Sequence, residues 1–264
     1  MLMRKLGFFV LLCLLWPLTA GAAPRQAEVG LADVIQALES PFKPGGLDTG
    51  IADFEAEFFQ ESRIVSLDRA QRGRGQVWFK FDRTLGERVP QSKFRWEYRQ
   101  PTEQEIVSDG RTLWVYLPEN NQVIESDIEF ALREQPDNPV TFLTGLGNLS
   151  RDFSIRWAAP NRDAAGNYVL ELQPRRTSQL IARLLIVVDK NAVLQYDNNL
   201  RPELRGAQST VFPILSSTVT DPNGNSTVIE FSAIRVNRGL SDSLFHFIRP
   251  ADVEVVRPSG MPGF

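Results

Sequence analysis

The sequence predicts a mainly β protein of the α+β class, with one curved antiparallel sheet of about ten strands, an N-terminal helix and a short central helix. Three observations support this fold class. From Ile51 onward, apolar residues recur with a period of two, which is typical of half-buried strands. Turn signals separate these runs at intervals of roughly 8–12 residues, as in antiparallel sheets. Residues 93–117 carry large aromatics on adjacent short runs, which must be covered by a core or by a ligand.

Residues 1–22 are predicted to be a secretory signal peptide. Arg4 and Lys5 form a basic start, residues 6–15 form an apolar region, and a cleavage site of the A-x-A type ends at Ala22. The apolar region is too short for a membrane span, which needs ~20 residues. We therefore expect an exported, soluble protein whose signal peptide is cleaved near Ala22.

The composition of the exported chain argues against thiol and nucleic-acid chemistry. Cys13, the only cysteine, lies within the predicted signal peptide, so no disulfide or thiol nucleophile is expected after cleavage. The whole chain has 29 basic and 32 acidic residues, and cleavage removes two basic residues and no acidic one. The cluster of Arg69, Arg72 and Arg74 is expected to be a solvated loop before a strand rather than a phosphate site.

An amphipathic helix is predicted at residues 31–39, because its apolar residues fall on one helical face. Ser40-Pro41 ends this helix. The helix and its following loop, residues 30–50, begin a single predicted domain that spans residues 23–264.

The strands and their turns follow the helix. Asp109-Gly110 between two strand-like runs favours a hairpin, and the stretch from Asp221 to Asn225 indicates a second one. Strands are predicted at 54–64, 76–81, 93–99, 103–108, 111–117, 121–126, 153–158, 167–173, 180–189, 192–197, 210–220 and 226–236, with a short one near 245–248.

Two further segments interrupt this pattern. Asn138 is a good N-cap and Pro139 fits the first helical position, so a short central helix is predicted there, limited by Gly145 and Gly147. Residues 197–209 are predicted to be a loop insertion.

No motif for catalysis or metal binding is evident in the sequence. His246, the only histidine, is expected to point away from Phe245 and Phe247 on a solvated strand position. A catalytic triad would need a serine in a nucleophile elbow, and a zinc site would need several more ligands. A pair of carboxylates that meet only in three dimensions stays open, and with it a cell-envelope hydrolase as an alternative function.

Short motifs in the aromatic half and in the tail of the chain form one combined pattern. It comprises Gly75–Lys80, Lys93–Tyr98, Gln100-Pro101, Val107–Gly110, Thr112–Tyr116, Gln122-Val123, Asp221, Gly224–Thr227, Ile229, Phe231, Phe245–Phe247 and Pro250. This pattern resembles the periplasmic outer-membrane lipoprotein carrier protein family, LolA. The resemblance covers residues 50–130 well and residues 180–257 loosely.

The resemblance implies an unclosed antiparallel β-barrel whose helices act as a lid over an apolar cavity. It implies a periplasmic chaperone, not an enzyme, that needs no cofactor or nucleic acid. Such a monomeric carrier takes acylated lipoproteins from an inner-membrane lipoprotein-releasing transporter to an outer-membrane acceptor. The alternative is a periplasmic lipid- or lipoprotein-sensing protein on the same fold.

The resemblance also implies site residues. Phe94, Trp96 and Ile106 correspond to positions that line the acyl cavity, although each could equally be ordinary sheet core. Trp114 is a fourth candidate, and its facing depends on the strand register across the Asp109-Gly110 turn. The arginine that latches the lid corresponds to Arg88, with Arg83 as the alternative, within an insertion at residues 82–90.

Overall fold

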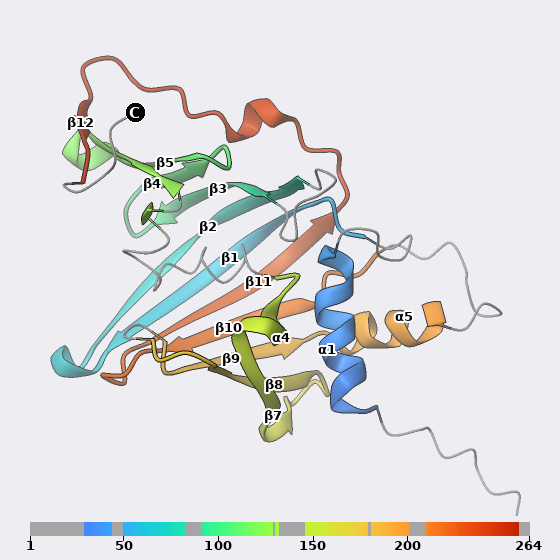
Figure 1. Cartoon of the computed structure of the whole chain (residues 1–264). Coiled ribbons are helices and arrows are strands. Elements are labelled where there is room, and N and C mark those ends of the chain that lie inside the picture. Colours follow the sequence, from blue (N-terminus) through green and yellow to red (C-terminus); the bar gives the residue numbers. More distant parts are fainter. Residues whose placement is uncertain are drawn as a thin grey trace, which may run out of the picture.

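One sheet forms the body of the structure (Figure 1). The computed structural model describes residues 29–43, 50–82, 91–128, 130–131, 146–178, 181–200 and 210–258. The twelve strands within these ranges are β1 (Asp53–Ile64), β2 (Arg69–Asp82), β3 (Gln91–Gln100), β4 (Gln104–Ser108), β5 (Thr112–Leu117), β6 (Gln122–Asp127), β7 (Phe153–Arg162), β8 (Tyr168–Pro174), β9 (Arg183–Val188), β10 (Ile214–Thr220), β11 (Ser226–Val236) and β12 (Glu254–Val256).

The strand order is β12-β6-β5-β4-β3-β2-β1-β11-β10-β9-β8-β7, and the sheet is not closed. Neighbouring strands are antiparallel, except that β12 runs parallel to β6. Both predicted hairpins are present: β4 and β5 flank the Asp109-Gly110 turn, and β10 and β11 flank the turn that begins at Asp221. The predicted fold class, a mainly β protein with an unclosed antiparallel sheet, is confirmed.

The helical elements that can be bounded within the described residues are short: α1 (Leu31–Glu39), η1 (Ser40–Phe42), η2 (Val65–Leu67), η3 (Pro118–Asn120), α4 (Leu149–Asp152), α5 (Lys190–Leu200) and η5 (Asp242–Phe245). Helix α1 has the predicted bounds and lies against α5 (Figure 1). Within the described part of the chain, no helix has the length and apolar character needed to cross a membrane.

Three local predictions were wrong. Residues 192–197, predicted to be a strand, belong to helix α5. The Asp189 side chain accepts a hydrogen bond from the Asn191 N–H at 2.7 Å and so caps the first turn of this helix. Ala192 and Val193 are buried and Tyr196 is partly buried. These positions do not alternate as they would along a strand, but they lie on one face of a helix.

The other two corrections concern β2 and the tail. The cluster of Arg69, Arg72 and Arg74 lies within β2, which begins at Arg69, rather than in a loop. Residues 245–248 form the end of η5 and an extended segment, not a strand, and the short strand of the tail is β12. His246 is exposed between two buried phenylalanines, as the alternation of side chains suggested.

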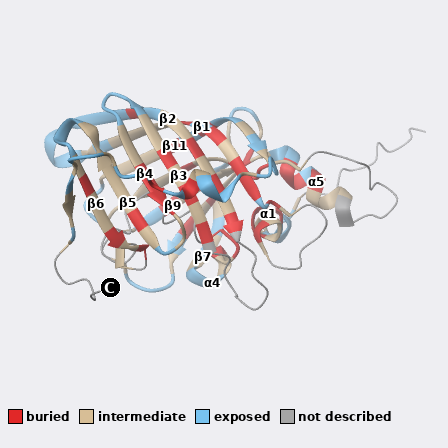
Figure 2. Cartoon of the chain, turned by 90° about the horizontal axis from the view of Figure 1, so that it is seen from above, coloured by how far each residue is buried: buried red, intermediate tan, exposed pale blue. Residues whose placement is uncertain are grey.

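The main core lies between one face of the sheet and the helices. Buried residues recur at every second position along the central strands and continue into α1 (Figure 2). The central strands contribute many phenylalanines, and α1 contributes Val34, Ala37 and Leu38. This phenylalanine-rich face of the sheet therefore packs with helical elements that include α1, and not on a second sheet.

A second, smaller core lies on the opposite face of β4, β5 and β6. Val107, Val123 and Phe247 are buried there, with partly buried aromatic neighbours. The chain after β11 crosses this face and is anchored at its start by Asp53, whose carboxylate accepts N–H bonds from Arg238, Gly239 and Leu240. This C-terminal segment, residues 237–256, ends in β12 at the sheet edge.

Candidate functional site

Aromatic rings line the face of the sheet that carries the main core. Phe79 pairs in register with Phe54 of β1 and with Phe94 of β3, and residues directly opposite on adjacent strands share a face. The ring centroids of these two pairs are 5.2 Å and 5.4 Å apart. We call this surface the aromatic face, and it consists of Phe54, Phe58, Val77, Phe79, Phe81, Phe94, Trp96, Ile106 and Phe231.

Three of the four predicted ligand-binding residues lie together on the aromatic face. Trp96 pairs with Ile106 across β3 and β4, and Phe94 lies two residues before Trp96 on the same side of β3. Their exposed fractions are 0%, 7% and 1% for Trp96, Ile106 and Phe94. The structure thus brings these three side chains together and covers them. Their role in binding a ligand stays a prediction.

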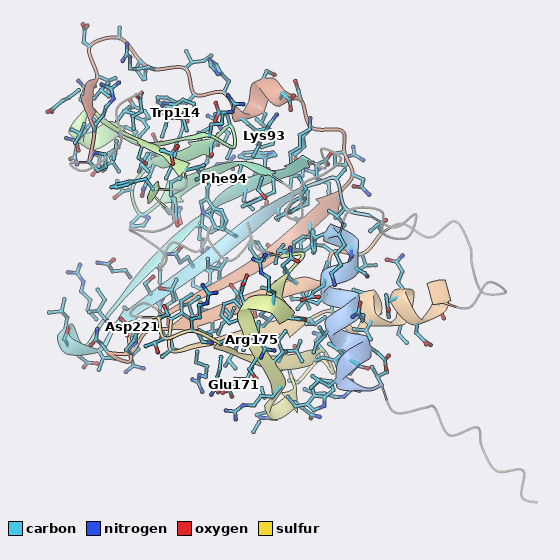
Figure 3. All side chains as sticks on the ribbon, in the orientation of Figure 1. Lys93, Phe94, Trp114, Glu171, Arg175 and Asp221 are labelled. Atoms are coloured by element: carbon cyan, nitrogen blue, oxygen red, sulfur yellow. The ribbon has the colours of Figure 1, made fainter. Side chains whose placement is uncertain are left out.

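Trp114 lies on the other face of the sheet, so the structure does not bring it together with Phe94, Trp96 and Ile106. It pairs with Val107, whereas its neighbour Val115 pairs with Ile106. The Trp114 ring lies 6.1 Å from the ring of Phe247 in the second core. Figure 3 shows the positions of Trp114 on β5 and Phe94 on β3. The register across the Asp109-Gly110 turn decides this facing, since a shift of one residue reverses every side chain of the strand.

The predicted latch and central helix cannot be placed on this face. Arg88 and its alternative Arg83 lie outside the described residues, and so do Asn138 and Pro139. Among the described residues, η1 and the segment before β10 contact the aromatic face, and α1 belongs to the same core. We call these three elements the cover.

Two phenylalanines from this cover insert into the aromatic face. The Phe42 ring, in η1, lies 5.1 Å from that of Phe81. The Phe212 ring lies 4.3 Å from that of Phe54 and 6.3 Å from that of Phe231. Phe212 lies two residues before the start of β10 and is 4% exposed, so a residue outside the strands is part of the main core.

Sequence reasoning missed Glu39, a buried carboxylate at the end of α1. It is 2% exposed. Its Oε1 accepts hydrogen bonds from the backbone N–H and the hydroxyl of Ser150 at 2.6 Å and 2.7 Å, and its Oε2 contacts Lys43 Nζ at 2.7 Å. Ser150 lies in α4, so this cluster ties the cover to a different part of the chain. The only hint in the sequence was a charged residue within the apolar helix pattern.

The polar atoms beside Trp96 are unusual for a core. The Trp96 indole N–H is buried and has no partner with hydrogen-bond geometry in the described structure. The neighbouring Tyr98 hydroxyl donates to Gln60 Oε1 at 2.7 Å. Burial raises the pKa of the Tyr98 phenol well above its ordinary value, and the nearby indole N–H of Trp96 opposes this effect only in part. The phenol is therefore neutral at physiological pH.

The aromatic face continues into an open polar groove of about 660 Å³ at the end away from α1. Its walls include Gln60, Gln71, Tyr98 and Gln104, and its floor includes Gly73. In the strand register, Gln71 pairs with Ser62, Gly73 pairs with Gln60, and Gln104 pairs with Tyr98. Because side chains alternate along each strand, these residues face the same side as Phe58 and Trp96.

The described residues show no arrangement suited to metal binding or acid–base catalysis. No group of three or more His, Cys, Asp and Glu side chains among them could hold a metal ion. The facing carboxylates of Glu97 and Glu105 are both bound by the Arg95 guanidinium, at 2.6 Å and 2.7 Å. Burial raises the pKa of Glu105 and Arg95 opposes the rise, as expected for a bridged ion pair on a sheet surface.

Comparison with known proteins finds one matching family and several relatives. The family described as "Outer membrane lipoprotein carrier protein LolA" matches residues 49–198. An outer-membrane lipoprotein carrier protein from Hahella chejuensis is 26% identical over 213 residues, which cover 80% of this chain and 85% of the relative. One from Alkalilimnicola ehrlichii is 25% identical over 257 residues, or 97% of each chain. A solved LolA superfamily protein from Nitrosomonas europaea has 15% identity over 83% of this chain and 99% of its own, with a TM-score of 0.40.

The fold and site define a protein with an open antiparallel sheet whose aromatic face lies under a helical cover. The family match spans more than half of the chain, and the chain belongs to the LolA family of outer-membrane lipoprotein carrier proteins. The family is periplasmic, and its members are carriers rather than enzymes. The resemblance inferred from the sequence motifs is confirmed.

Proposed function

We propose that this protein binds the acyl chains of lipoproteins on the aromatic face and carries them through the periplasm. The observation that supports this proposal most strongly is the cover of that face. Phe94, Trp96 and Ile106 are buried on this face, and elsewhere on the same face Phe42 of η1 and the loop residue Phe212 pack against Phe81 and Phe54. Membership of the lipoprotein carrier family supports the same class of cargo.

The physical requirement on such a carrier is a surface that replaces the membrane interior. Burying an acyl chain is worth ~0.8 kcal/mol per methylene, so a lipoprotein with two or three long chains needs tens of kcal/mol of apolar contact. The aromatic face supplies apolar area of this kind, but in the closed state its rings are packed against Phe42 and Phe212. Binding therefore requires the cover to move, and an acyl chain would take the place of these rings.

The proposed transport route follows from the family. The signal peptide would be cleaved near Ala22, and the exported monomer would receive lipoproteins from an inner-membrane releasing transporter. It would then transfer them to an outer-membrane acceptor. The carrier must also release the lipoprotein, so its affinity for the acyl chains cannot be maximal. Opening the closed core costs free energy, and this cost lowers the apparent affinity for the lipoprotein.

Photocrosslinking from the two sheet faces tests the proposal. Tyr98 borders the aromatic face, whereas Tyr116 belongs to the second core, and both are tyrosines of intermediate exposure. Either can be replaced by benzoylphenylalanine, which keeps an aromatic ring at the site. We expect the Tyr98 variant, irradiated in the periplasm, to crosslink to acylated lipoproteins, and the Tyr116 variant to give at most a tenth of that yield.

The control and the contradicting result are clear. An aromatic replacement is preferable to a carboxylate at Phe94 or Trp96, because a charge buried in the closed state would itself unfold the protein. Equal crosslinking from both faces, or none from Tyr98 in a folded protein, would show that the aromatic face does not hold the cargo.

A further inference from the structure

The polar groove at the open end of the aromatic face carries a pattern of its own. Along β1, the side chains on this face change from Phe54 and Phe58 to Gln60 and Ser62. The same change occurs between Trp96 and Tyr98 on β3, and between Ile106 and Gln104 on β4. The surface thus passes from apolar to polar within a few residues on β1, β3 and β4, and β2 lies between the first two of these strands.

The groove is rich in hydrogen-bond donors. Its lining contains side-chain amides, hydroxyls and two guanidinium groups, and no Asp or Glu among the described residues. Arg72 is paired with Glu61 at 2.7 Å, whereas Arg69 makes no ion pair within the described part of the chain. A ligand group that fits this lining must therefore be rich in acceptor atoms.

Part of the groove is held in place by its own hydrogen bonds. The Tyr98 hydroxyl donates to Gln60, the Gln60 amide donates to Ser62 Oγ at 3.2 Å, and Ser62 Oγ lies 3.0 Å from Thr227 Oγ1. Gln71 and Gln104 stand beside this chain and make no side-chain hydrogen bond within the described structure. Gly73 lacks a side chain, and the Tyr98 ring lies over it, 3.0 Å from where a Cβ atom would stand.

We propose that this groove binds the polar head of the cargo, meaning the ester and amide carbonyls that join the acyl chains to the lipoprotein's N-terminal residue. This inference rests on the proposed function. The surface is apolar at one end and polar at the other, so an amphiphile bound to it has one favourable orientation. In the reverse orientation its carbonyl groups would be buried without hydrogen-bond donors, which costs free energy. The acyl chains then extend over Trp96 and Phe58 towards α1, and the polypeptide leaves through the open groove. Gln71 and Gln104 donate to the carbonyls, and Arg69 adds an unpaired positive charge.

The test compares two probes on the same variants. One is a dipalmitoylglyceryl-cysteine tetrapeptide, which has the head, and the other is N-phenylnaphthylamine, an apolar dye without carbonyls. We expect the double variant Gln71→Leu with Gln104→Leu to weaken lipopeptide binding about tenfold and to change dye binding by less than about twofold, because two hydrogen bonds are lost. Arg69→Gln should weaken lipopeptide binding, whereas Arg74→Gln should not, because Arg74 is on the same strand but faces the other side, over the Phe59 ring.

The outcomes separate the two proposals. If the wild-type protein binds both probes and the double variant keeps its lipopeptide affinity, the head-binding groove is wrong and the carrier function stands. A parallel loss of dye and lipopeptide affinity would also overturn the groove, since the effect would not depend on the head. If the wild-type protein binds neither probe, the proposed function fails, and the groove assignment fails with it.

Discussion

At the scale of single residues, the packing of β2 against β3 depends on a glycine, Gly75. A Cβ atom placed on Gly75 would lie 1.7 Å from the carbonyl oxygen of Glu97 and 2.8 Å from the Phe58 ring. The pairing of β2 with β3 shifts register between Arg74 and Gly75, and at this irregularity the Gly75 backbone lies directly against the Glu97 carbonyl group. The rings of Phe58 and Trp96 lie beside it, with centroids 4.6 Å apart.

Gly75→Ala should destabilise the protein by more than about 3 kcal/mol, because backbone must move to admit the methyl group. Gly73→Ala is the matched control. Its added Cβ would lie 3.0 Å from the Tyr98 ring and at an ordinary contact distance of 3.6 Å from the Gln100 carbonyl oxygen. Because the Tyr98 side chain can move aside, we expect a loss of about 1 kcal/mol. Denaturant unfolding measures both values. Equal losses in the two variants would show that the close strand contact at Gly75 is not important for stability.

At the scale of elements, α1 is a short helix held by a small number of polar contacts. Nine residues make a helix that is marginal by itself, so tertiary contacts hold α1 in place. The buried carboxylate of Glu39 provides the specific part of that attachment through Ser150 and Lys43. In the carrier proposed here, the same contacts would have to break when the cover opens.

Glu39→Gln should loosen α1 while the sheet stays folded. Hydrogen bonds to a charged group contribute ~1.5–3 kcal/mol, so the loss of charge should speed amide hydrogen exchange in α1 by about tenfold or more. Asp33→Asn, at the exposed start of the same helix, serves as the control and should change exchange much less. Unchanged protection of α1 in the Glu39 variant would mean that apolar packing alone holds the cover.

At the scale of the whole molecule, Phe212 joins the cover to the sheet. It precedes β10, yet its ring contacts the rings of Phe42, Phe54 and Phe231. A hollow of about 400 Å³ lies beside it, lined by residues that include Leu215 and Ile234. In this structure the Phe212 ring therefore packs on the aromatic face, and the hollow lies next to it.

Phe212→Ala should lower the free energy of unfolding by about 3–5 kcal/mol and leave a cavity on the aromatic face. The emptied space should bind N-phenylnaphthylamine more tightly than the wild-type protein does, as measured by fluorescence titration. Phe59→Ala removes a partly exposed ring from the opposite face of β1 and should affect stability less and dye binding hardly at all. Weaker dye binding by the Phe212 variant would mean that this ring forms the binding surface instead of occupying it.

The sequence by itself determined the local pattern of this protein. Helix α1, the hairpin at Asp109-Gly110 and the shared facing of Phe94 and Trp96 follow from period, turn chemistry and alternation along a strand, all of which act over a few residues. Family membership followed from the same motifs. The strand expected at 192–197 was wrong because so short an apolar run is an ambiguous signal, and the segment instead forms a helix that packs against α1.

Only the tertiary structure decided which apolar residues share a covered face. The facing of Trp114 depends on the pairing of β4 with β5, the C-terminal segment closes the second core, and Phe212 reaches the first core from a loop. Glu39 meets Ser150 across more than a hundred residues. Such contacts join segments that are distant in sequence, and the pattern of either segment alone contains no information about its partner.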